Sequence, residues 1–398
     1  MNRRFFMGAL AGTTAAALID RHAAIAAALP ADKLDLKKHE YARVIRAADR
    51  ALAERPGSVT ASRSERSAGG PHDFFSEGDY WWPDPKNPGG PYIRRDGQIN
   101  PDNFNDHRQA MVKMSLCVAS LTAGWVVSGE KRYAERAAQH LRVFFLDEKT
   151  YMAPHLLYAQ AIKGVTKGRG IGIIDTIHLA EVARSIPALG RSRALSKADE
   201  QGLHKWFAEY LKWIDAHPNG AEERAAKNNH GSCWVMQAAA FAQLVGNEKM
   251  IERCRELFRT KLIPDQLTAD GSFPLELART RPYSYSLFNL DILGIACQIL
   301  STPGDDLWGF TLPGGAGLRR AFEFHYPFIA DKSRWPFAKD IEHFDQLPVR
   351  MPSLLFAGIA YKEPRYIELW KKLEADPVDA EVIRNFPVRQ PVLWVNAT

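Results

Sequence analysis

Cysteine is scarce in this chain, whose 398 residues include only Cys117, Cys233, Cys254 and Cys297. Four cysteines this widely spaced indicate neither a disulfide framework nor a zinc site. All four fall in stretches with helical periodicity, where a cysteine usually serves as a small buried hydrophobic residue. A Cys233–Cys254 bridge stays open as an alternative that would need an oxidising compartment.

Cofactor motifs are absent as well. The sequence has no dinucleotide fingerprint, no P-loop and no His–Cys metal spacing, so we predict no cofactor and no metal, although a metal held by scattered carboxylates stays open. After the N-terminal segment, the sequence pattern alone predicts no apolar run that is long and uncharged enough for a membrane helix. Convincing runs of alternating polar and apolar residues are also missing, which argues against a fold built on strands.

Neither sign of charge is in large excess. Lys plus Arg number 52 and Asp plus Glu number 46, a formal net charge of +6. The segment before Ala27 contributes +2 of this, from Arg3, Arg4 and Arg21 against Asp20, which leaves +4. This excess suits a polyanionic ligand, but it is spread without basic runs, so nothing in it indicates nucleic acid.

The first 26 residues are typical of an export signal. Arg3 and Arg4 precede two phenylalanines and an alanine-rich run to Ile19, and small-x-small cleavage sites follow at 24–26 and 26–28. Paired arginines before phenylalanines indicate a twin-arginine signal, which is an address and not an anchor. We therefore expect a cleaved signal peptide over 1–26 and a periplasmic protein with no membrane contact. A plain secretory signal or a short anchor is the alternative.

Helical periodicity dominates the remainder, which we expect to be a single domain over 27–398. Helices are predicted at 36–54, 106–128, 131–145, 172–188, 197–215, 232–245, 248–265, 285–301, 318–330 and 351–373. Asp106 and Ser196 are predicted N-caps, and residues 217–220 read as a turn. The 233–245 stretch has no charge, which predicts burial on every side, whereas 197–215 is amphipathic. Buried helices alternating with half-exposed ones are typical of a double-layered helical barrel.

A long non-helical segment over about 56–101 interrupts this pattern. It is rich in Gly, Pro and aromatic residues, including Tyr80, Trp81 and Trp82, and carries Arg94 and Arg95. A loop of this length is usually a lid or a binding loop. Aromatic rings stack on sugar faces and guanidinium groups hold carboxylates, so the segment could form one wall of a sugar site. Packing of the tryptophans as a structural strut is the alternative.

Two further segments carry candidate chemistry. Asn228, Asn229 and His230 stand at the start of the uncharged helix, where free backbone N–H groups favour an anionic ligand. Residues 275–289 place two arginines and two tyrosines, among them Arg279 and Tyr285, before another buried helix. For each residue alone a structural role, such as capping or a satisfied core histidine, is the default.

The combination resembles a known family. Three features carry the resemblance: the Asp79–Pro85 and Tyr92–Gly97 loop, Asn228-Asn229-His230 with Trp234 after it, and Glu276-Leu277-Ala278-Arg279 followed by tyrosine. Together they resemble the alginate lyase-like superfamily, most closely polysaccharide lyase family 38. The resemblance covers most of the mature chain. The better-known alginate lyases have a His after their Tyr, where this chain has Ser286, and their Arg–Tyr spacing is one residue longer.

The resemblance implies an all-α fold, an (α/α) toroid that is an incomplete double-layered helical barrel of about six to seven helix pairs. It also implies lyase activity on an acidic polysaccharide of uronates, such as alginate or glucuronan. The catalytic roles that it implies fall on Asn229, His230, Arg279 and Tyr285, with Glu223 as a further member.

β-Elimination asks for such a set on chemical grounds. Removal of the C5 proton requires a neutralised uronate carboxylate, for which Asn229, His230 and Arg279 are suitable. Arg279 should also lower the phenol pKa of Tyr285 and make a phenolate accessible. In mannuronate the C5 proton and C4 oxygen share a face, so one tyrosine could serve as base and acid. In guluronate they do not, and His230 would be the base. Glu223 would orient His230 or donate to the carboxylate.

Other residues extend the predicted site. Tyr283 could replace Tyr285 in the catalytic register, and His178 could reach the cleft from an apolar helix. Arg94 and Arg95 would bind flanking uronates, and Asn228, Tyr80, Trp81 and Trp82 would contact the sugar. A glycoside hydrolase using carboxylates among Asp79, Asp175 and Glu223, or a non-catalytic uronate-binding protein, are the rival functions.

Overall fold

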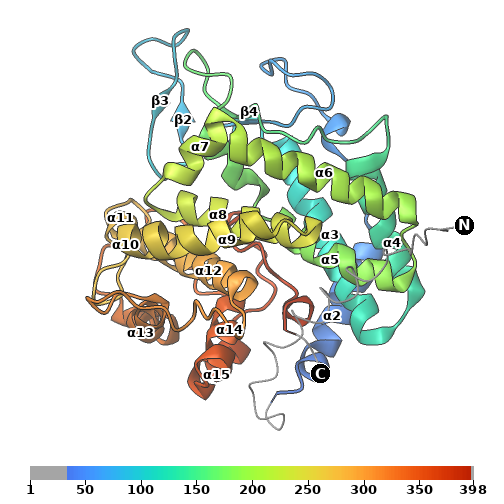
Figure 1. Cartoon of the computed structure of the whole chain (residues 1–398). Coiled ribbons are helices and arrows are strands. Elements are labelled where there is room, and N and C mark those ends of the chain that lie inside the picture. Colours follow the sequence, from blue (N-terminus) through green and yellow to red (C-terminus); the bar gives the residue numbers. More distant parts are fainter. Residues whose placement is uncertain (1–33, 396–398) are drawn as a thin grey trace, which may run out of the picture.

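The computed structural model describes residues 34–395, which form one mainly helical body (Figure 1). The predicted signal peptide over 1–26 lies outside these residues. The α-helices are α2 (Leu36–Ala53), α3 (Asp106–Ser128), α4 (Lys131–Leu141), α5 (Leu179–Ser192), α6 (Lys197–Ala216), α7 (Pro218–Ala225), α8 (Asn229–Val245), α9 (Glu248–Leu257), α10 (Ile263–Gln266), α11 (Pro274–Leu277), α12 (Pro282–Leu300), α13 (Leu318–Ala330), α14 (Pro352–Ala360), α15 (Pro364–Lys372) and α16 (Ala380–Asn385).

Helices α8 and α12 form the centre of the body. They pack against each other, and α8 also packs against α5, α6 and α9, while α12 packs against α14 (Figure 1). Most residues of both helices are buried, as their lack of charge predicts. The more amphipathic α6 and α9 cover one side of this pair. The prediction of buried and half-exposed helices in two layers is therefore confirmed.

The start of α6 is predicted correctly. The Ser196 side chain accepts from the Asp199 N–H at 3.1 Å, and the Asp199 carboxylate accepts from the Ser196 N–H at 2.9 Å, which makes a capping box. The predicted cap of α3 is wrong by one residue, because Asn105 occupies the N-cap and Asp106 is the first helical residue.

The predicted turn over 217–220 is also wrong. Chain direction does change there, but Pro218 is the first residue of α7, where its missing N–H has no cost. His217 is the C-cap of α6 and the N-cap of α7. Its Nδ1 caps α7 by accepting from the Asn219 N–H at 3.2 Å. This short helix matters for the site because it carries Glu223.

Four other predicted helices are divided. The 131–145 stretch forms α4 and then a π-helical turn over Arg142–Leu146. The 351–373 stretch forms α14 and α15, because Pro364 begins a new helix. The 172–188 stretch starts as a 3-10 helix over Gly170–Thr176 before α5, and a π-helical turn over Phe258–Leu262 separates α9 from α10.

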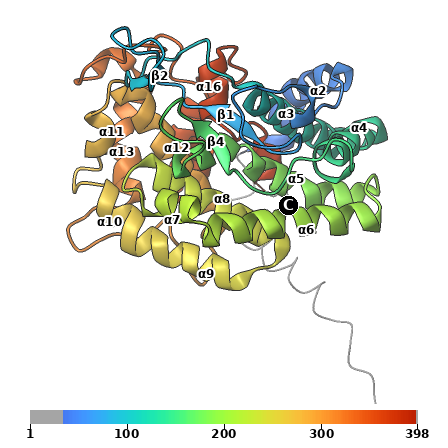
Figure 2. The same ribbon diagram turned by 90° about the horizontal axis from the view of Figure 1, so that it is seen from above.

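The long segment over 56–101 contains little helix, as predicted, but it is ordered by short strands. Strand β1 (Phe75–Glu77) pairs in parallel with β4 (Tyr158–Ala161), and β2 (Trp81–Trp82) pairs in antiparallel with β3 (Ile93–Arg94). Figures 1 and 2 show these strands together on one side of the helical body. The residues next to β2 and β3 contact the start of α12, through Tyr80 with Tyr285 and through Asp96 with Arg279.

Helix α3 corrects the expectation about membrane helices. By length and composition it could cross a membrane, although the sequence pattern suggested no such run. More than half of its apolar stretch is buried, and it packs against α2, α4 and α5 as a core helix does. The four cysteines are all buried and free, so the alternative of a Cys233–Cys254 bridge is not realised.

Candidate active site

The N-terminus of α8 places three of the predicted residues. The Asn228 side chain caps the helix by accepting from the His230 N–H at 3.4 Å, so the structural alternative holds for this asparagine. Asn229 and His230 are the first two helical residues. Their side chains therefore stand at the edge of the buried core, where the backbone N–H groups of the first helical turn donate to Glu276 and to Asn228.

His230 is paired with Glu223. Its Nδ1 lies 2.7 Å from Glu223 Oε1, and the carboxylate is almost completely buried in α7. Burial raises the pKa of Glu223, and the neighbouring His230 lowers it in part. Because Nδ1 is held by the carboxylate, Nε2 is the ring nitrogen left for a substrate. The predicted orienting role of Glu223 therefore has a geometric basis.

Asn229 is held by a residue to which the sequence assigned no role. Glu276, in α11, accepts from the Asn229 backbone N–H at 2.8 Å and from its Nδ2 at 2.7 Å. Burial raises the pKa of Glu276, and these two hydrogen bonds oppose that rise. The sign of this role in the sequence is that Glu276 belongs to the Glu-Leu-Ala-Arg motif. Its partner lies 47 positions away, so the contact could not be predicted.

Tyr285 lies in the first turn of α12, almost buried, with its hydroxyl 2.8 Å from that of Tyr80. The guanidinium carbon of Arg279 lies 4.4 Å from the centre of the Tyr285 ring. Burial raises the phenol pKa, and this outweighs the lowering by Arg279 and by the Tyr80 hydrogen bond. The predicted net lowering of the Tyr285 pKa is therefore wrong, because the ring is desolvated.

The guanidinium of Arg279 is occupied by a carboxylate of the long loop. Its Nε and Nη2 donate to the two oxygens of Asp96 at 3.2 and 3.0 Å. Asp96 also accepts from Thr280 Oγ1 at 3.1 Å and from Arg94 Nη2 at 2.6 Å. These contacts attach the β2–β3 hairpin to the start of α12. Asp96 lies in the Tyr92–Gly97 motif, but no feature of the sequence indicates its partner.

The predicted aromatic wall is partly present. Trp81 and Trp82 are half-buried, and the Trp82 Nε1 donates to Gln98 O at 3.0 Å. Arg95 stands over the Trp82 ring with its guanidinium carbon 5.0 Å from the ring centre. Arg94 is exposed. Both the strut and the wall interpretations therefore apply to these side chains.

Two predicted residues lie elsewhere. Tyr283 is fully buried, and its hydroxyl donates to Phe328 O at 2.9 Å, so its polar group is used inside the fold. His178 is also buried, with Nε2 2.9 Å from Arg384 O, and burial lowers its pKa to about 4. Their predicted contacts with substrate are corrected: neither side chain reaches the surface, because each is packed among core helices.

Comparison with known proteins identifies the family. The family model for alginate lyase matches residues 58–335. The chain belongs to the alginate lyase family. An alginate lyase from Bacteroides ovatus has 33% sequence identity over 96% of this chain and 98% of its own, with a TM-score of 0.79. None of the curated proteins matches the chain.

More distant structures share the fold. Alginate lyase A1-III from Sphingomonas species A1 has 13% identity over 91% of this chain and 97% of its own, with a TM-score of 0.51. A variant of alginate lyase A1-III complexed with a tetrasaccharide covers 96% of this chain and 94% of its own, at 13% identity and a TM-score of 0.55. The predicted all-α toroid and the predicted family are confirmed, and the protein is a polysaccharide lyase that acts on uronate polymers.

The carboxylates that a hydrolase would need are engaged differently in this alginate lyase family member. Asp79 accepts from Arg108 at 3.0 and 2.6 Å and lies 2.8 Å from Arg384. Burial alone would raise the Asp79 pKa, but the two arginines outweigh it and lower the pKa strongly. Asp175 is buried in the same cluster. Both aspartates are ion-paired inside the fold, which removes the rival carboxylate pair.

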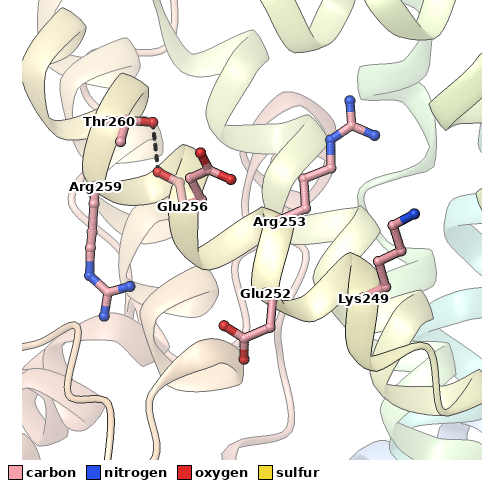
Figure 3. A pocket seen from close by; sticks show the side chains of 6 residues that line it. All are labelled: Lys249, Glu252, Arg253, Glu256, Arg259 and Thr260. Atoms are coloured by element: carbon pink, nitrogen blue, oxygen red, sulfur yellow. Dashed lines mark hydrogen bonds between the residues drawn. The ribbon is translucent and has the colours of Figure 1, made fainter.

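A surface hollow over α9 is unrelated to this site. It is lined by residues of α9 and the turn after it, which carry both signs of charge (Figure 3): Lys249, Glu252, Arg253, Glu256, Arg259 and Thr260. None of the predicted site residues lines it. Across residues 34–395, no group of three or more His, Cys, Asp or Glu side chains is arranged to hold a metal ion.

Proposed function

We propose that the ends of α8 and α12 form the catalytic centre of this lyase, with Tyr285 and His230 as the proton-transferring groups and Asn229 as a donor to the uronate carboxylate. The observation that carries this assignment is the position of Glu276. It binds Asn229 directly, and His230 and Arg279 are both near enough to lower its pKa. Arg279 in turn stacks on Tyr285, so the four predicted residues belong to one site.

Which of these groups takes the C5 proton depends on the polymer. In mannuronate, the Tyr285 phenolate takes the C5 proton, the C4–C5 double bond forms, the C4–O bond breaks, and the same hydroxyl returns the proton to the leaving oxygen. The Tyr80 hydroxyl and the Arg279 cation are the groups that stabilise that phenolate. In guluronate, His230 Nε2 takes the proton from the opposite face and neutral Tyr285 protonates the leaving oxygen.

The carboxylate must lose its charge for the C5 proton to become acidic. Asn229 has an amide N–H beyond the one that it donates to Glu276, and the positive end of the α8 helix dipole favours negative charge at the same place. Arg279 is shared with Asp96, so it acts on the substrate either through its remaining donor or after Asp96 moves. Alginate is the proposed polymer, because the Bacteroides ovatus relative is an alginate lyase, and glucuronan is the alternative.

We also propose export to the periplasm through the twin-arginine signal over 1–26. Fractionation of cells that express the full chain tests this, with Arg3→Lys and Arg4→Lys combined as the comparison. The parent protein should appear in the periplasm and the double variant in the cytoplasm. Equal export of both would contradict the twin-arginine signal.

Ultraviolet absorbance over time tests the function directly. Purified protein is given polymannuronate, polyguluronate or glucuronan separately, and Tyr285→Phe serves as the inactive comparison. Each cleavage creates an unsaturated, absorbing end, so a rise on one polymer identifies the substrate. New reducing ends without absorbance would indicate hydrolysis. If neither signal appeared, the result would favour a non-catalytic binding protein.

A further inference from the structure

Two arginines near the aromatic wall differ in the groups that they bind. Arg279 donates to both oxygens of Asp96. Arg169, in the loop after β4, has no carboxylate oxygen within 4.0 Å among the residues that the structure describes. Asp175, Asp79 and Glu222 influence it only from beyond that distance. Arg169 therefore lacks a direct ion pair among the described residues. Arg95, over the Trp82 ring, lacks one as well, but within the same residues it makes no side-chain hydrogen bond that would hold its guanidinium in place.

The Arg169 side chain is held in place without a counter-charge. Its Nε donates to Gln160 O at 3.1 Å and its Nη2 to Gln160 Oε1 at 2.9 Å, which leaves Nη1 without a hydrogen bond inside the described part of the chain. Gln160 has a φ of 48°, a left-handed conformation that costs a non-glycine residue free energy. Both acceptors of this strained residue face the guanidinium. The arginine is thus positioned but not neutralised.

Its surroundings are those of the sugar wall. The guanidinium carbon lies 5.8 Å from the centre of the Trp81 ring. Gly78 makes room for it, because a Cβ there would lie 2.9 Å from Arg169 Nη2 and 2.7 Å from Trp81 Cδ1. Trp81 follows Tyr80, which contacts Tyr285. Arg169 is also near enough to Glu223 to lower its pKa. It stands between the aromatic loop and the Glu223–His230 pair.

Three further arginines near this wall are ion-paired. Arg108 is bound to Asp79, Arg384 to Asp79 and Glu381, and Arg281 to Glu381 at 3.2 Å. Arg184 likewise has no carboxylate partner, but it donates to Leu393 O in the C-terminal segment. Burial lowers the pKa of Arg169, so an arriving carboxylate would stabilise its charged form.

We propose that Arg169 binds a uronate carboxylate of the polymer chain, with the sugar ring of that residue against Trp81. The inference rests on the proposed function, since it places this contact in the same site. A planar guanidinium with free donors matches a carboxylate, and the neighbouring ring matches the apolar face of a sugar. Arg169 is a substrate-binding residue here, and it takes no part in proton transfer.

Binding to an inactive enzyme tests the inference. In a Tyr285→Phe background, the Kd is measured for a mannuronate oligosaccharide and for the same oligosaccharide with its carboxylates reduced to alcohols. Arg169→Gln should weaken binding of the acidic oligosaccharide about 10- to 100-fold, as expected for a lost charged hydrogen bond. Binding of the reduced oligosaccharide should change less than about twofold. Arg169→Lys, which keeps the charge but not the fork, should fall between.

Arg132→Gln is the matched control. Arg132 also stands over an aromatic ring, that of Tyr133, at 4.8 Å, but it is already paired with Glu130 and Asp49. This variant loses the same charge and should bind both oligosaccharides as the parent does. Thermal melting of each variant checks the fold, because a loss caused by local unfolding would affect both oligosaccharides equally.

Three results would overturn the inference: no loss with Arg169→Gln, equal loss for both oligosaccharides, or equal loss with Arg132→Gln. If the parent cleaves polymer but binds the oligosaccharide too weakly to measure, KM on the polymer replaces Kd and the same fold-changes apply. Absence of any cleavage by the unmutated protein, on any of the three polymers, would instead contradict the proposed function, and the role of Arg169 would be rejected with it.

Discussion

The two walls of the site are built differently. The helix wall consists of Glu223, Asn229, His230 and Glu276, and the loop wall of Tyr80, Trp81, Trp82 and Asp96. In the helix wall each side chain that faces substrate is held by a buried carboxylate from a neighbouring short helix. In the loop wall the side chains are half-buried and are held without a buried carboxylate: Tyr80 contacts Tyr285, and Asp96 contacts Arg279, Thr280 and Arg94.

We infer from this difference that the helix wall positions catalytic side chains, whereas the loop wall captures the polymer. A buried carboxylate with two hydrogen bonds fixes a side chain, because its release would leave polar groups unsatisfied in the core. Partly exposed pairs such as Asp96–Arg279 are worth about 0–1 kcal/mol and can rearrange when a polymer enters. We therefore expect changes in the helix wall to affect mainly kcat and changes in the loop wall to affect mainly KM.

Tyr285→Phe should have the largest effect, because this hydroxyl is the proposed base and acid. Loss of the proton-transferring group should lower kcat about 100- to 10,000-fold with the fold unchanged. Tyr283→Phe is the matched variant. Its hydroxyl donates to Phe328 O, so it should cost about 1 kcal/mol of unfolding free energy and leave kcat unchanged. An active Tyr285→Phe beside an inactive Tyr283→Phe would reverse the catalytic register.

The pH dependence follows from the raised pKa of Tyr285. Below that pKa, the phenolate fraction grows with pH, so kcat/KM on polymannuronate should rise by up to about tenfold per pH unit above neutrality. On polyguluronate, where neutral Tyr285 would be the acid, the rate should not rise in this way and should fall once the phenol ionises. A flat profile on polymannuronate from about pH 7 to 9 would count against a phenolate base.

Glu276→Gln should have the next largest effect on activity. The amide offers one acceptor where Asn229 needs two, so the Asn229 side chain should turn or lose a bond. We expect kcat to fall about 10- to 100-fold with KM changed less, since the lost contact is worth about 1–3 kcal/mol. Glu256→Gln, at the exposed hollow over α9 (Figure 3), is the control and should match the parent. A pure KM effect of Glu276→Gln would place Asn229 in binding only.

Asp96→Asn should have the smallest effect and should act on KM. Without the Asp96 charge, Arg279 loses a competitor for the uronate carboxylate, so KM should fall about two- to fivefold with kcat little changed. Asp102→Asn, an exposed aspartate of the same segment, should leave KM unchanged. A rise in KM for Asp96→Asn would mean that the carboxylate holds the loop wall over the substrate instead of competing with it.

The sequence predicted most of the helices because their signals are local. The capping box at Ser196 and the uncharged stretch of α8 require no partner from elsewhere in the chain. Errors arose where two local signals conflict. Pro-Asn-Gly at 218–220 is typical of a turn, but Pro218 also begins a helix readily, and α7 forms because Glu223 and Gly220 pack into the body.

The sequence by itself determined the all-α class, the buried character of α8 and α12, and the motif that contains Asn229, His230, Arg279 and Tyr285. Only the tertiary structure decided which groups are paired. Asn229 meets Glu276, Arg279 meets Asp96 across 183 positions, and Arg169 is left with no carboxylate within 4.0 Å among the described residues. The physical reason is that ion pairing and desolvation depend on distance and burial, which the spacing of residues along a chain does not specify.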